Sequence, residues 1–586
     1  MTLGKILQRN AQQYPDKAAI LFQEERITFS QLNDLVNRLA NGLLNLGLEK
    51  GDRVAILMPK TPEVIITFLA VARAGGVIFP VNYKLKSDDL RTIFNYVSPQ
   101  IVVSERIYRP LLEKLFLPYH PLSKIIFTGK RSKKDLNLKD IIDKESSDEP
   151  QVKVKESDFV YLNYTSGTTG VPKGVMTSHA NIVYNTIAAI AAFNFTHQDV
   201  HLCMFPSYMH PHELFARSLY LGGTAVISDS IFPKTIAREI EDKKVTAMMA
   251  VPYFYKSLFP LVKNKDYDFS SLRISEAGGM YSPPEFVERF SELFKLDLFP
   301  VWGSTETTGI ATAVRPNEGY KPGTIGRACL NYDIKVVDFH GDEVPDGQEG
   351  EMIIKGPAVM KGYFNLPGET ESVLKNEWYF TGDIVRKDEK GYIYFLGRKS
   401  GMMKVGGMKV YPLEIVEAIS SHPEVDEVAV VSERDAMRGE RPKAFIVLNQ
   451  GSNLSEGELR GYLRTKLADY KIPRKIEFIK ELPRTSGGKI IKGDLDKKSG
   501  RLRPAETREE IEQLAEIDRK LVELLNERAE AVIKLQEKLE PQKHSIFFPD
   551  YEESLLRKTL EENKGPIYDE SLEEIFDKIR AVIRLV

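Results

Sequence analysis

One short stretch, Tyr164–Val175, constrains the fold of this chain more than any other. It follows the apolar run 159–162, which is typical of a buried strand. Glycine lets a backbone approach a ligand closely, and free N–H groups, hydroxyls and an ammonium group together suit phosphate. The stretch therefore predicts a loop that binds a polyphosphate, with these candidate ligands: Thr165, Ser166, Gly167, Thr168, Thr169, Gly170 and Lys173.

The stretch is not a Walker loop, because its lysine precedes Gly174 and Val175 instead of standing before a serine or threonine. A segment rich in glycine, serine and threonine is also typical of a solvated linker, but the preceding strand and the closing Pro-Lys-Gly favour the loop. The pattern Tyr-Thr-Ser-Gly-Thr-Thr-Gly-x-Pro-Lys-Gly-Val resembles the phosphate loop of the adenylate-forming superfamily. That superfamily comprises acyl- and aryl-CoA synthetases, adenylation domains of peptide synthetases, and luciferases.

Length and composition limit the classes of protein to which the chain can belong. At 586 residues it is expected to hold more than one domain. Lys and Arg number 81 against 83 Asp and Glu, so charge favours neither nucleic acid nor an anionic membrane as a partner. Two cysteines cannot form a disulfide framework, which suits a reducing cytoplasm. The longest apolar segment, 64–81, is interrupted by Arg73 and two glycines, so we expect no membrane span.

The first 150 residues alternate helix and strand patterns. A helix is expected from Phe29, with Ser30 as its N-cap, followed by a strand over 52–58 and a helix over 62–74. Such alternation predicts a mostly parallel sheet covered on both faces. The charge-rich segment 130–149 is expected to be a surface loop. With the resemblance, this predicts a large α/β domain over 1–399 and a small α+β domain over 400–498.

Two segments resemble the parts of the superfamily that surround adenine and phosphate. A strand over 272–277 is expected to run into Gly278 and Gly279, whose bare backbone suits a flat ring. In the segment 301–306 the resemblance implies that Trp302, beside Gly303, stacks on the purine. It further implies that Thr305 binds phosphate and that Glu306 holds Mg²⁺.

Two further positions match the part of the superfamily that holds ribose. Asp383 follows Thr-Gly and is expected to end a strand, where its carboxylate accepts hydrogen bonds from the ribose hydroxyls. Arg398 matches a residue that contacts ribose or phosphate. Ser400 stands at the expected pivot between the two domains, where the superfamily usually has Asp or Lys.

The segment 205–214 resembles the aromatic-His segment that borders the carboxylate pocket of the superfamily. His210 aligns with that histidine and is a candidate catalytic residue; the alternative is a structural histidine in a loop. Together with His212 and Glu213 it lacks the spacing of a zinc-binding helix, so we do not expect a metal cluster here.

Two segments of the small domain resemble mobile elements of the superfamily. Gly406 and Gly407 lie in a segment that matches the loop brought over the site for thioester formation. The segment 482–490 resembles the Pro-Arg-Thr-x-x-Gly-Lys loop, and its lysine is Lys489. The resemblance implies that this lysine bridges the substrate carboxylate and the α-phosphate, which lowers their repulsion.

These motifs together predict an acid–thiol ligase that uses ATP and Mg²⁺. The enzyme would form an acyl- or aryl-adenylate from a small carboxylic acid, release pyrophosphate, and pass the acyl group to CoA. Two alternatives stay open: phosphopantetheine on a carrier protein as the acceptor, and a regulator that binds adenylate without turnover. The sequence does not distinguish aromatic from fatty acids.

Beyond a linker at 499–504, residues 505–586 form a helical pattern with apolar residues at three- to four-residue spacing. Segments 517–528, 563–566 and 575–576 resemble the all-helical chorismate mutase, an intertwined dimer that binds a dicarboxylate. Arg528 and Glu552 match ligand positions, but Ile511 and Leu539 stand where cations are expected. We therefore expect a degenerate all-α domain of three helices that makes the chain a homodimer or binds an aromatic metabolite; an active mutase is the alternative.

Overall fold

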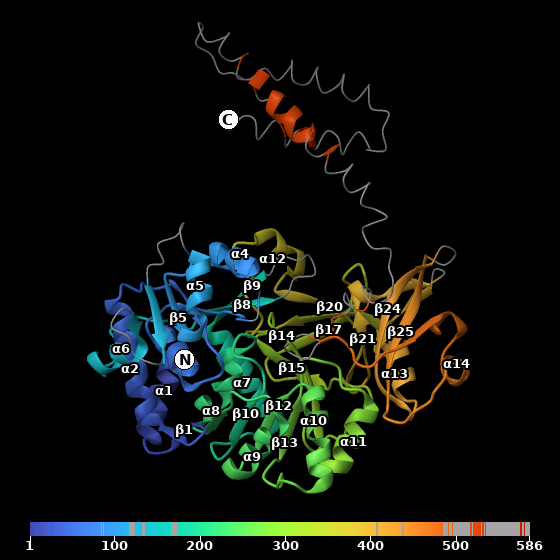
Figure 1. The fold of residues 1–586 in the computed structure, drawn as a ribbon, viewed down its shortest axis with the longest axis horizontal. Coiled ribbons are helices and arrows are strands. Elements are labelled where there is room, and N and C mark those ends of the chain that lie inside the picture. The colour runs from blue at the N-terminus through green and yellow to red at the C-terminus, as the bar shows by residue number, and fades with distance from the viewer. Residues whose placement is uncertain are drawn as a thin grey trace. The chain divides into compact units, whose positions relative to one another are not determined.

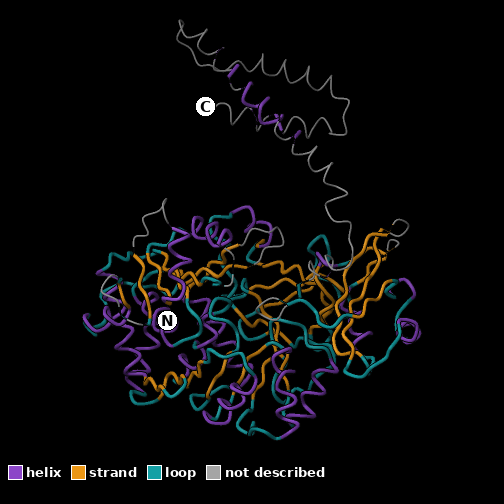
Figure 2. The backbone as a smooth tube through the Cα atoms, viewed as in Figure 1, coloured by secondary structure: helices purple, strands orange, loops and turns teal. Residues whose placement is uncertain are grey.

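The computed structural model describes residues 1–83, 85, 87–116, 124–129, 131, 135–165, 173–405, 408–435, 439–484, 490–491 and 495. In the tail it describes residues 516–517, 520–528, 530–531, 534, 575–576 and 579. The chain divides into two compact units, Met1–Lys492 and Gly493–Val586. In the first unit, strands are flanked by helices along much of the chain (Figures 1 and 2).

A seven-stranded sheet confirms the predicted α/β character of the first unit. All its neighbouring strands are parallel except the last pair, β8 and β9. Both faces are covered: Val54 and Ile56 of β3 pack into one apolar cluster, and Ala55 and Leu57 pack into another. The sheet order is β7 (Leu136–Asn137), β6 (Lys124–Thr128), β5 (Ile101–Glu105), β3 (Arg53–Leu57), β4 (Val77–Pro80), β8 (Phe159–Thr165) and β9 (Lys173–Ser178).

A nine-stranded sheet carries most of the site. Its first two strands come from the N-terminus: Ile20 of β1 pairs in parallel with Ala225 of β11, although the two strands lie far apart in sequence. The first 150 residues therefore contribute to two sheets. The order is β16 (Arg327–Ala328), β15 (Gly309–Ala313), β14 (Leu298–Ser304), β13 (Ile274–Ala277), β12 (Ala247–Ala250), β10 (Val200–Cys203), β11 (Thr224–Ile227), β1 (Ala18–Phe22) and β2 (Glu25–Thr28).

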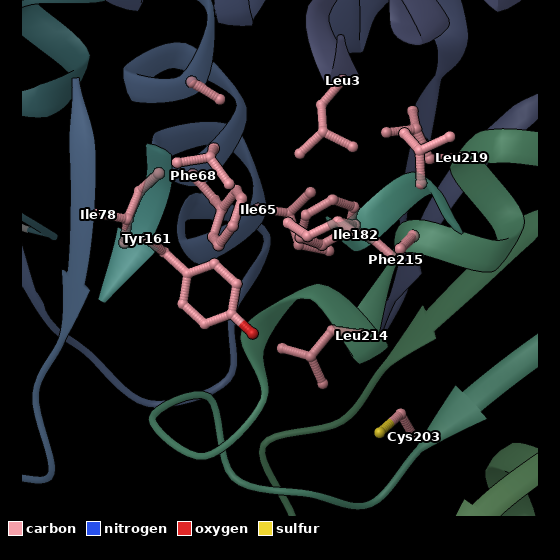
Figure 3. Close-up of a cluster of buried hydrophobic side chains, with 14 of the residues drawn as sticks. Leu3, Ile65, Phe68, Ile78, Tyr161, Ile182, Cys203, Leu214, Phe215 and Leu219 are labelled. Carbon is pink, nitrogen blue, oxygen red and sulfur yellow. The ribbon is translucent and has the colours of Figure 1, made fainter. Parts of the chain in front are cut away.

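The helix α3 (Pro62–Arg73) is buried along almost its whole length, which explains why its sequence is so apolar. Figure 3 shows Ile65 and Phe68 among side chains from other elements. The Phe68 ring lies 5.8 Å from that of Tyr161 and 5.2 Å from that of Phe215. Burial lowers the pKa of Arg73 to about 10, and its guanidinium donates to the carbonyl of Gly4 at 2.7 Å. Within the described residues, no helix is both long enough and apolar enough to cross a membrane.

Two local predictions for this part of the chain were wrong. The helix α2 (Phe29–Asn45) is capped by Thr28, whose hydroxyl accepts from Gln31 N while the Gln31 side chain accepts from Thr28 N. Ser30 lies inside the helix. The expected surface loop at 130–149 contains α6 (Leu138–Lys144), which buries Leu138 and Ile142 beneath its charged face.

The large domain contains further α-helices besides α2, α3 and α6. They are α1 (Leu3–Gln13), α4 (Ser87–Val97), α5 (Arg109–Phe116), α7 (His179–Phe193), α8 (Ala216–Leu221), α9 (Pro233–Lys243), α10 (Pro252–Asn264), α11 (Pro284–Phe294) and α12 (Pro367–Val373). Short 3-10 turns occur at η1 (Arg106–Tyr108) and η2 (Pro211–Leu214).

An antiparallel sheet links the large domain to the last part of the first unit. The strand β20 runs on through Asp383, so this residue does not end a strand as predicted; a positive φ of 71° at Gly382 bends the backbone just before it. The sheet contains β17 (Asp333–Val337), β18 (Glu349–Lys355), β20 (Trp378–Lys387), β19 (Leu374–Lys375) and β21 (Ile393–Arg398).

A small α+β region follows the turn η3 (Lys399–Gly401). Its core joins strands and helices through residues such as Val405, Ile415 and Leu459. The elements are β22 (Met403–Val405), β23 (Met408–Val410), α13 (Pro412–Ser420), β24 (Val425–Asp435), β25 (Gly439–Leu448), α14 (Glu456–Arg464), η4 (Asp469–Lys471) and β26 (Lys475–Phe478).

In the second unit, the described residues are helical, as the sequence predicts. Arg528 lies on the described helical segment 520–528 and is partly exposed. Glu552 lies outside the described residues.

Candidate active site

A cavity of about 1780 Å³ lies where several strands of the nine-stranded sheet end. Residues directly after parallel strands line it, as is common for ligand sites in α/β folds. Eleven of the predicted site residues border this one cavity: Lys173, His210, Gly278, Gly279, Trp302, Gly303, Thr305, Glu306, Asp383, Arg398 and Ser400. Thr165 ends β8. Ser166, Gly167, Thr168, Thr169, Gly170, Gly406, Gly407 and Lys489 lie outside the described residues.

Glycine is required at two positions of the cavity wall. Gly279 has a φ of 77°, which side-chain-bearing residues rarely adopt, and it turns the chain after β13. A Cβ on Gly303 would lie 2.2 Å from the carbonyl oxygen of Gly309, because β14 and β15 approach closely there. Both positions leave bare backbone facing the cavity.

Asp383 is fully buried and is bonded to two predicted site residues. Trp302 Nε1 donates to Asp383 Oδ2 at 2.8 Å, and Arg398 Nε lies 2.7 Å from Asp383 Oδ1. Burial raises the pKa of Asp383 to about 6, although Arg398 and Trp302 act in the opposite direction. The three side chains form a wall whose carboxylate is already oriented.

Glu306 is oriented by a residue that the sequence analysis missed. Tyr363 donates its hydroxyl to Glu306 Oε1 at 2.9 Å. Burial and the nearby Glu306 charge both raise the pKa of Tyr363, so the phenol stays protonated as the donor. The Lys173 ammonium lies 5.3 Å from the centre of the same ring and pairs with Glu369 on α12. Thr305, next to Glu306, is also buried at the cavity wall.

Neighbouring histidines occupy different environments. His210 lines the cavity, and its ring centre lies 6.4 Å from that of Phe205. His212 is buried, and its Nδ1 lies 3.0 Å from the Tyr161 hydroxyl. Burial lowers the pKa of His212 to about 3, which keeps this ring neutral at pH 7. Within the described residues, no group of three His, Cys, Asp or Glu side chains is arranged to hold a metal ion.

The small region contacts the large domain beside the cavity. Lys256 Nζ lies 2.6 Å from Asp426 Oδ1, and Tyr281 donates to Glu417. Arg484 pairs with Glu427 at 2.9 Å and lies over the ring of Tyr253.

Arg484 and Ile490 flank the segment that holds Lys489. They pair through a backbone bridge, and both line the cavity. The described residues on either side of positions 485–489 are therefore both at the cavity wall.

Several site residues were not predicted from the sequence. Tyr363, Glu369 and Arg217 belong to no motif, and no site role was predicted for Glu213 or Glu276, with which Arg217 pairs. Spacing provides no signal for them, because Tyr363 lies 57 positions from Glu306 and Glu276 lies 59 from Arg217. Such pairs can be recognised only in the structure, where a buried carboxylate lies next to a hydrogen-bond donor.

Comparisons with known proteins agree on the first unit. Residues 7–364 match the family description AMP-binding enzyme, and residues 414–489 match the AMP-binding enzyme C-terminal domain. A long-chain-fatty-acid–CoA ligase of Bacillus subtilis is 31% identical over 523 residues, covering 84% of this chain and 93% of that protein. A feruloyl-CoA synthase of Amycolatopsis is 31% identical, covering 85% and 99%.

A solved structure and a further family description complete the comparison. An anthranilate–CoA ligase in complex with anthranoyl-AMP superposes with a TM-score of 0.79 at 26% identity, covering 85% of this chain and 97% of that one. Residues 511–586 match chorismate mutase type II.

Proposed function

The chain belongs to the family of AMP-binding enzymes, among acyl- and aryl-CoA ligases, and from this premise we propose that it joins a small carboxylic acid to CoA in two steps. In the first step the acid and ATP form an acyl- or aryl-adenylate and pyrophosphate. In the second, the thiol of CoA displaces AMP. One observation carries the proposal: Gly279 and Glu306, which follow β13 and β14, line a single cavity together with Asp383 of β20.

The nucleoside would lie against the Trp302–Asp383 wall. The bare backbone at Gly278 and Gly279 leaves room for a flat base, and the Trp302 ring provides an aromatic face. The ionised carboxylate of Asp383 accepts hydrogen bonds from two vicinal hydroxyls, and Arg398 carries positive charge toward the phosphates. The loop 165–170 and Lys173 would bind the phosphate chain.

The residues around Glu306 fit Mg²⁺. This ion prefers one or two carboxylates together with phosphate oxygens and water, so it needs no cluster of protein ligands. Glu306 provides one oriented carboxylate beside Thr305 at the cavity wall. When bound there, Mg²⁺ would neutralise phosphate charge.

The chemical difficulty of the first step is that two anions must meet. A carboxylate oxygen forms a bond to the α-phosphorus while the bond from that phosphorus to the pyrophosphate oxygen breaks. Lys489 would hold both groups through its ammonium, which reduces their repulsion and aligns them. Arg484 and Ile490 support this role, since both border the cavity.

In the second step the thiolate sulfur attacks the acyl carbon, and the bond to the AMP phosphate oxygen breaks. We place the boundary between the large and small domains at residue 400, in the turn η3 (Lys399–Gly401). Rotation about Ser400 would withdraw Lys489 and bring Gly406 and Gly407 to the cavity. His210, at the cavity wall, would then border the acyl group.

The proposal is tested by pyrophosphate release from ATP with a panel of carboxylic acids. Lys489→Ala is expected to abolish adenylate formation and to spare thioester formation from supplied adenylate. Lys480→Ala, at an exposed position just before that segment, is the matched control and should change neither step. Equal loss of both half-reactions in Lys489→Ala would contradict the role of this lysine, and no adenylate with any acid would contradict the function.

The acceptor is tested separately. We favour CoA because the relatives named above are CoA ligases. Replacing CoA with a phosphopantetheinylated carrier protein should reduce thioester formation. A higher rate with the carrier protein would instead place the enzyme in a biosynthetic assembly line.

For the tail we propose a degenerate chorismate mutase domain that makes the chain a homodimer. The support is that Ile511 and Leu539 stand where two cationic residues are expected. Arg528 is then left with too few other cations to bind both carboxylates of a dicarboxylate. The full chain is expected to form no prephenate from chorismate and to sediment as a dimer. Measurable prephenate would overturn the first statement, and a monomer would overturn the second.

A further inference from the structure

One hydrogen bond joins the wall of the cavity to the small domain. Tyr281 donates its hydroxyl to Glu417 Oε1, although the two residues lie 136 positions apart in sequence. Tyr281 lines the cavity and closely follows Gly279, in the turn after β13. Glu417 lies on α13, beyond the boundary that we place at residue 400. The bond therefore connects the turn that we assign to the base with a helix of the small domain.

The helix α13 provides part of the cavity wall. Its residues Leu413 and Val416 line the cavity, whereas Glu417 is not among the described residues that do so. Glu417 instead reaches the cavity through the side chain of Tyr281. A change at Glu417 can thus alter the position of α13 without removing a group that faces the cavity.

The small domain lies in the orientation that the first step requires. Arg484 and Ile490, on either side of the segment that holds Lys489, both line the cavity. Rotation about Ser400 for the second step would carry α13 away from the turn that holds Tyr281, so the hydrogen bond would break. A bond that forms in only one of two orientations stabilises that orientation.

The surroundings of the bond strengthen it. Both side chains are partly buried, and a Cβ built on Gly323 would lie 3.5 Å from the Tyr281 hydroxyl oxygen and 4.0 Å from Glu417 Oε1. Burial and the Glu417 charge raise the pKa of Tyr281, so the phenol stays protonated as the donor. A partly buried hydrogen bond to a carboxylate is stronger than an exposed ion pair. It should therefore stabilise the contact between the domains more than the pair of Lys256 and Asp426 does.

We propose that Tyr281 and Glu417 couple nucleotide binding to the orientation of the small domain: their hydrogen bond stabilises the orientation that forms adenylate and breaks before the thioester step. A base packed on Gly278 and Gly279 would order the turn that carries Tyr281, so ATP would favour the bond. This inference rests on the proposed function, which supplies the two orientations. Both are positioning residues, because they act on the reacting groups through the small domain.

Two variants test the coupling in each half-reaction. Tyr281→Phe removes the donor, and Glu417→Leu removes the acceptor. Each should lower kcat/KM for adenylate formation at least about tenfold, because the competent orientation becomes less populated. Neither should slow thioester formation from supplied adenylate. The double variant should lie within about twofold of the poorer single variant, because both changes remove the same bond.

Tyr320→Phe is the matched control. The Tyr320 hydroxyl accepts from Gly323 N at 3.1 Å, so this bond lies near the pair but stays within the large domain. Both half-reactions of this variant should remain within about twofold of wild type. A loss of adenylate formation as large as that in Tyr281→Phe would contradict the coupling.

Distances between spin labels measure the orientation without turnover. Cys203 and Cys329 are buried, so labels can be attached selectively at Glu288→Cys on α11 and Gly461→Cys on α14, which are exposed positions. Labelled chains are mixed with an excess of unlabelled chains, so that a dimer carries one labelled pair. Adding α,β-methylene ATP should shift wild type toward one distance. In Tyr281→Phe the equilibrium constant for this shift should be at least about tenfold smaller.

The possible outcomes separate this inference from the proposed function. Equal loss of both half-reactions, additive effects of the two variants, or label distances that do not respond to the nucleotide would overturn the inference alone. Absence of adenylate from wild type with every acid would overturn the proposed function as well. Should one variant fail to fold, as judged by thermal unfolding, the other variant and the wild-type distances decide.

Discussion

Buried carboxylates at the two ends of the cavity have different surroundings. At the end that we assign to the nucleotide, Asp383 is held by Trp302 and Arg398, and Glu306 accepts from Tyr363. At the end that we assign to the acyl group, Glu213 is almost fully buried and is held by Arg217. The first end thus presents oriented polar groups, whereas Phe205, Tyr208 and Ile310 make the second end mainly apolar and aromatic.

This difference predicts that the two ends have separate effects, one on the catalytic rate and the other on the selection of the acid. Groups that are already oriented stabilise charge without reorganising during the reaction, so removing one should slow every substrate alike. A mainly apolar wall discriminates among substrates by the shape and polarity that each one presents to it. Changes at the nucleotide end should therefore alter kcat or the KM for ATP with all acids, and changes at the acyl end should alter the ranking of acids.

Glu306→Gln is expected to have the largest effect. Removing this charge should reduce kcat for adenylate formation about 10²- to 10³-fold with every acid, because the developing phosphate charge loses its stabilisation. Tyr363→Phe is the control: it keeps the carboxylate and removes the donor, and its loss should be smaller. Steady-state pyrophosphate release measures both. If kcat fell with only some of the acids, the proposed difference between the two ends of the cavity would be wrong.

Asp383→Asn is expected to raise the KM for ATP about 10- to 100-fold at pH 8 with little effect on the ranking of acids. In wild type, the raised pKa of about 6 predicts that the KM for ATP increases as the pH falls through 6, where the carboxylate becomes protonated. Initial rates at varied ATP between pH 5 and 8 measure this. A variant with the same pH profile as wild type would contradict the assignment.

The same group predicts an opposite trend in stability. Because the pKa of Asp383 is higher in the folded state than the ordinary value of 3.8, folding favours the protonated form. The free energy of unfolding should therefore fall as the pH rises from about 4 to 6, by on the order of 3 kcal/mol from this group. Urea unfolding of wild type and Asp383→Asn at pH 4.5 and 7 isolates the difference. A constant difference between the two proteins would contradict the predicted pKa.

Trp302→Phe should act more weakly. Phenylalanine keeps an aromatic face and removes the Nε1 donor, so the KM for ATP should rise up to about tenfold. Since that donor lowers the pKa of Asp383, the pH at which the KM changes should also move upward. An unchanged pH profile would indicate that Trp302 contacts the base without orienting Asp383.

Lys256→Ala should have the smallest effect. Lys256 and Asp426 are each about one-third exposed, so their ion pair should contribute less than about 1 kcal/mol to the contact between the large and small domains. Adenylate formation should fall only about two- to threefold, and the difference from wild type should disappear at high salt. A large effect that persists in salt would mean that this contact, and not the nucleotide end, limits the first step.

The sequence was most informative where function depends on consecutive residues. Motifs such as 301–306 predicted the cavity wall, because a strand, a glycine and two polar residues in a row bring those side chains to one place whatever lies around them. Capping was less predictable: Ser30 and Thr28 are equally suitable hydroxyls, and only the position of Gln31 relative to the helix start decides between them. The helix at Leu138–Lys144 was missed because its two buried side chains are few among many charges.

By itself, therefore, the sequence determined the α/β class, the family and many of the residues that line the cavity. Only the tertiary structure decided that the N-terminal hairpin joins β11, that Tyr363 orients Glu306, and that Arg217 pairs with both Glu213 and Glu276. The physical reason is that a hydrogen-bond partner in the interior is chosen by burial and by packing between distant strands. Local sequence patterns do not show which distant side chain will lie next to a given buried group.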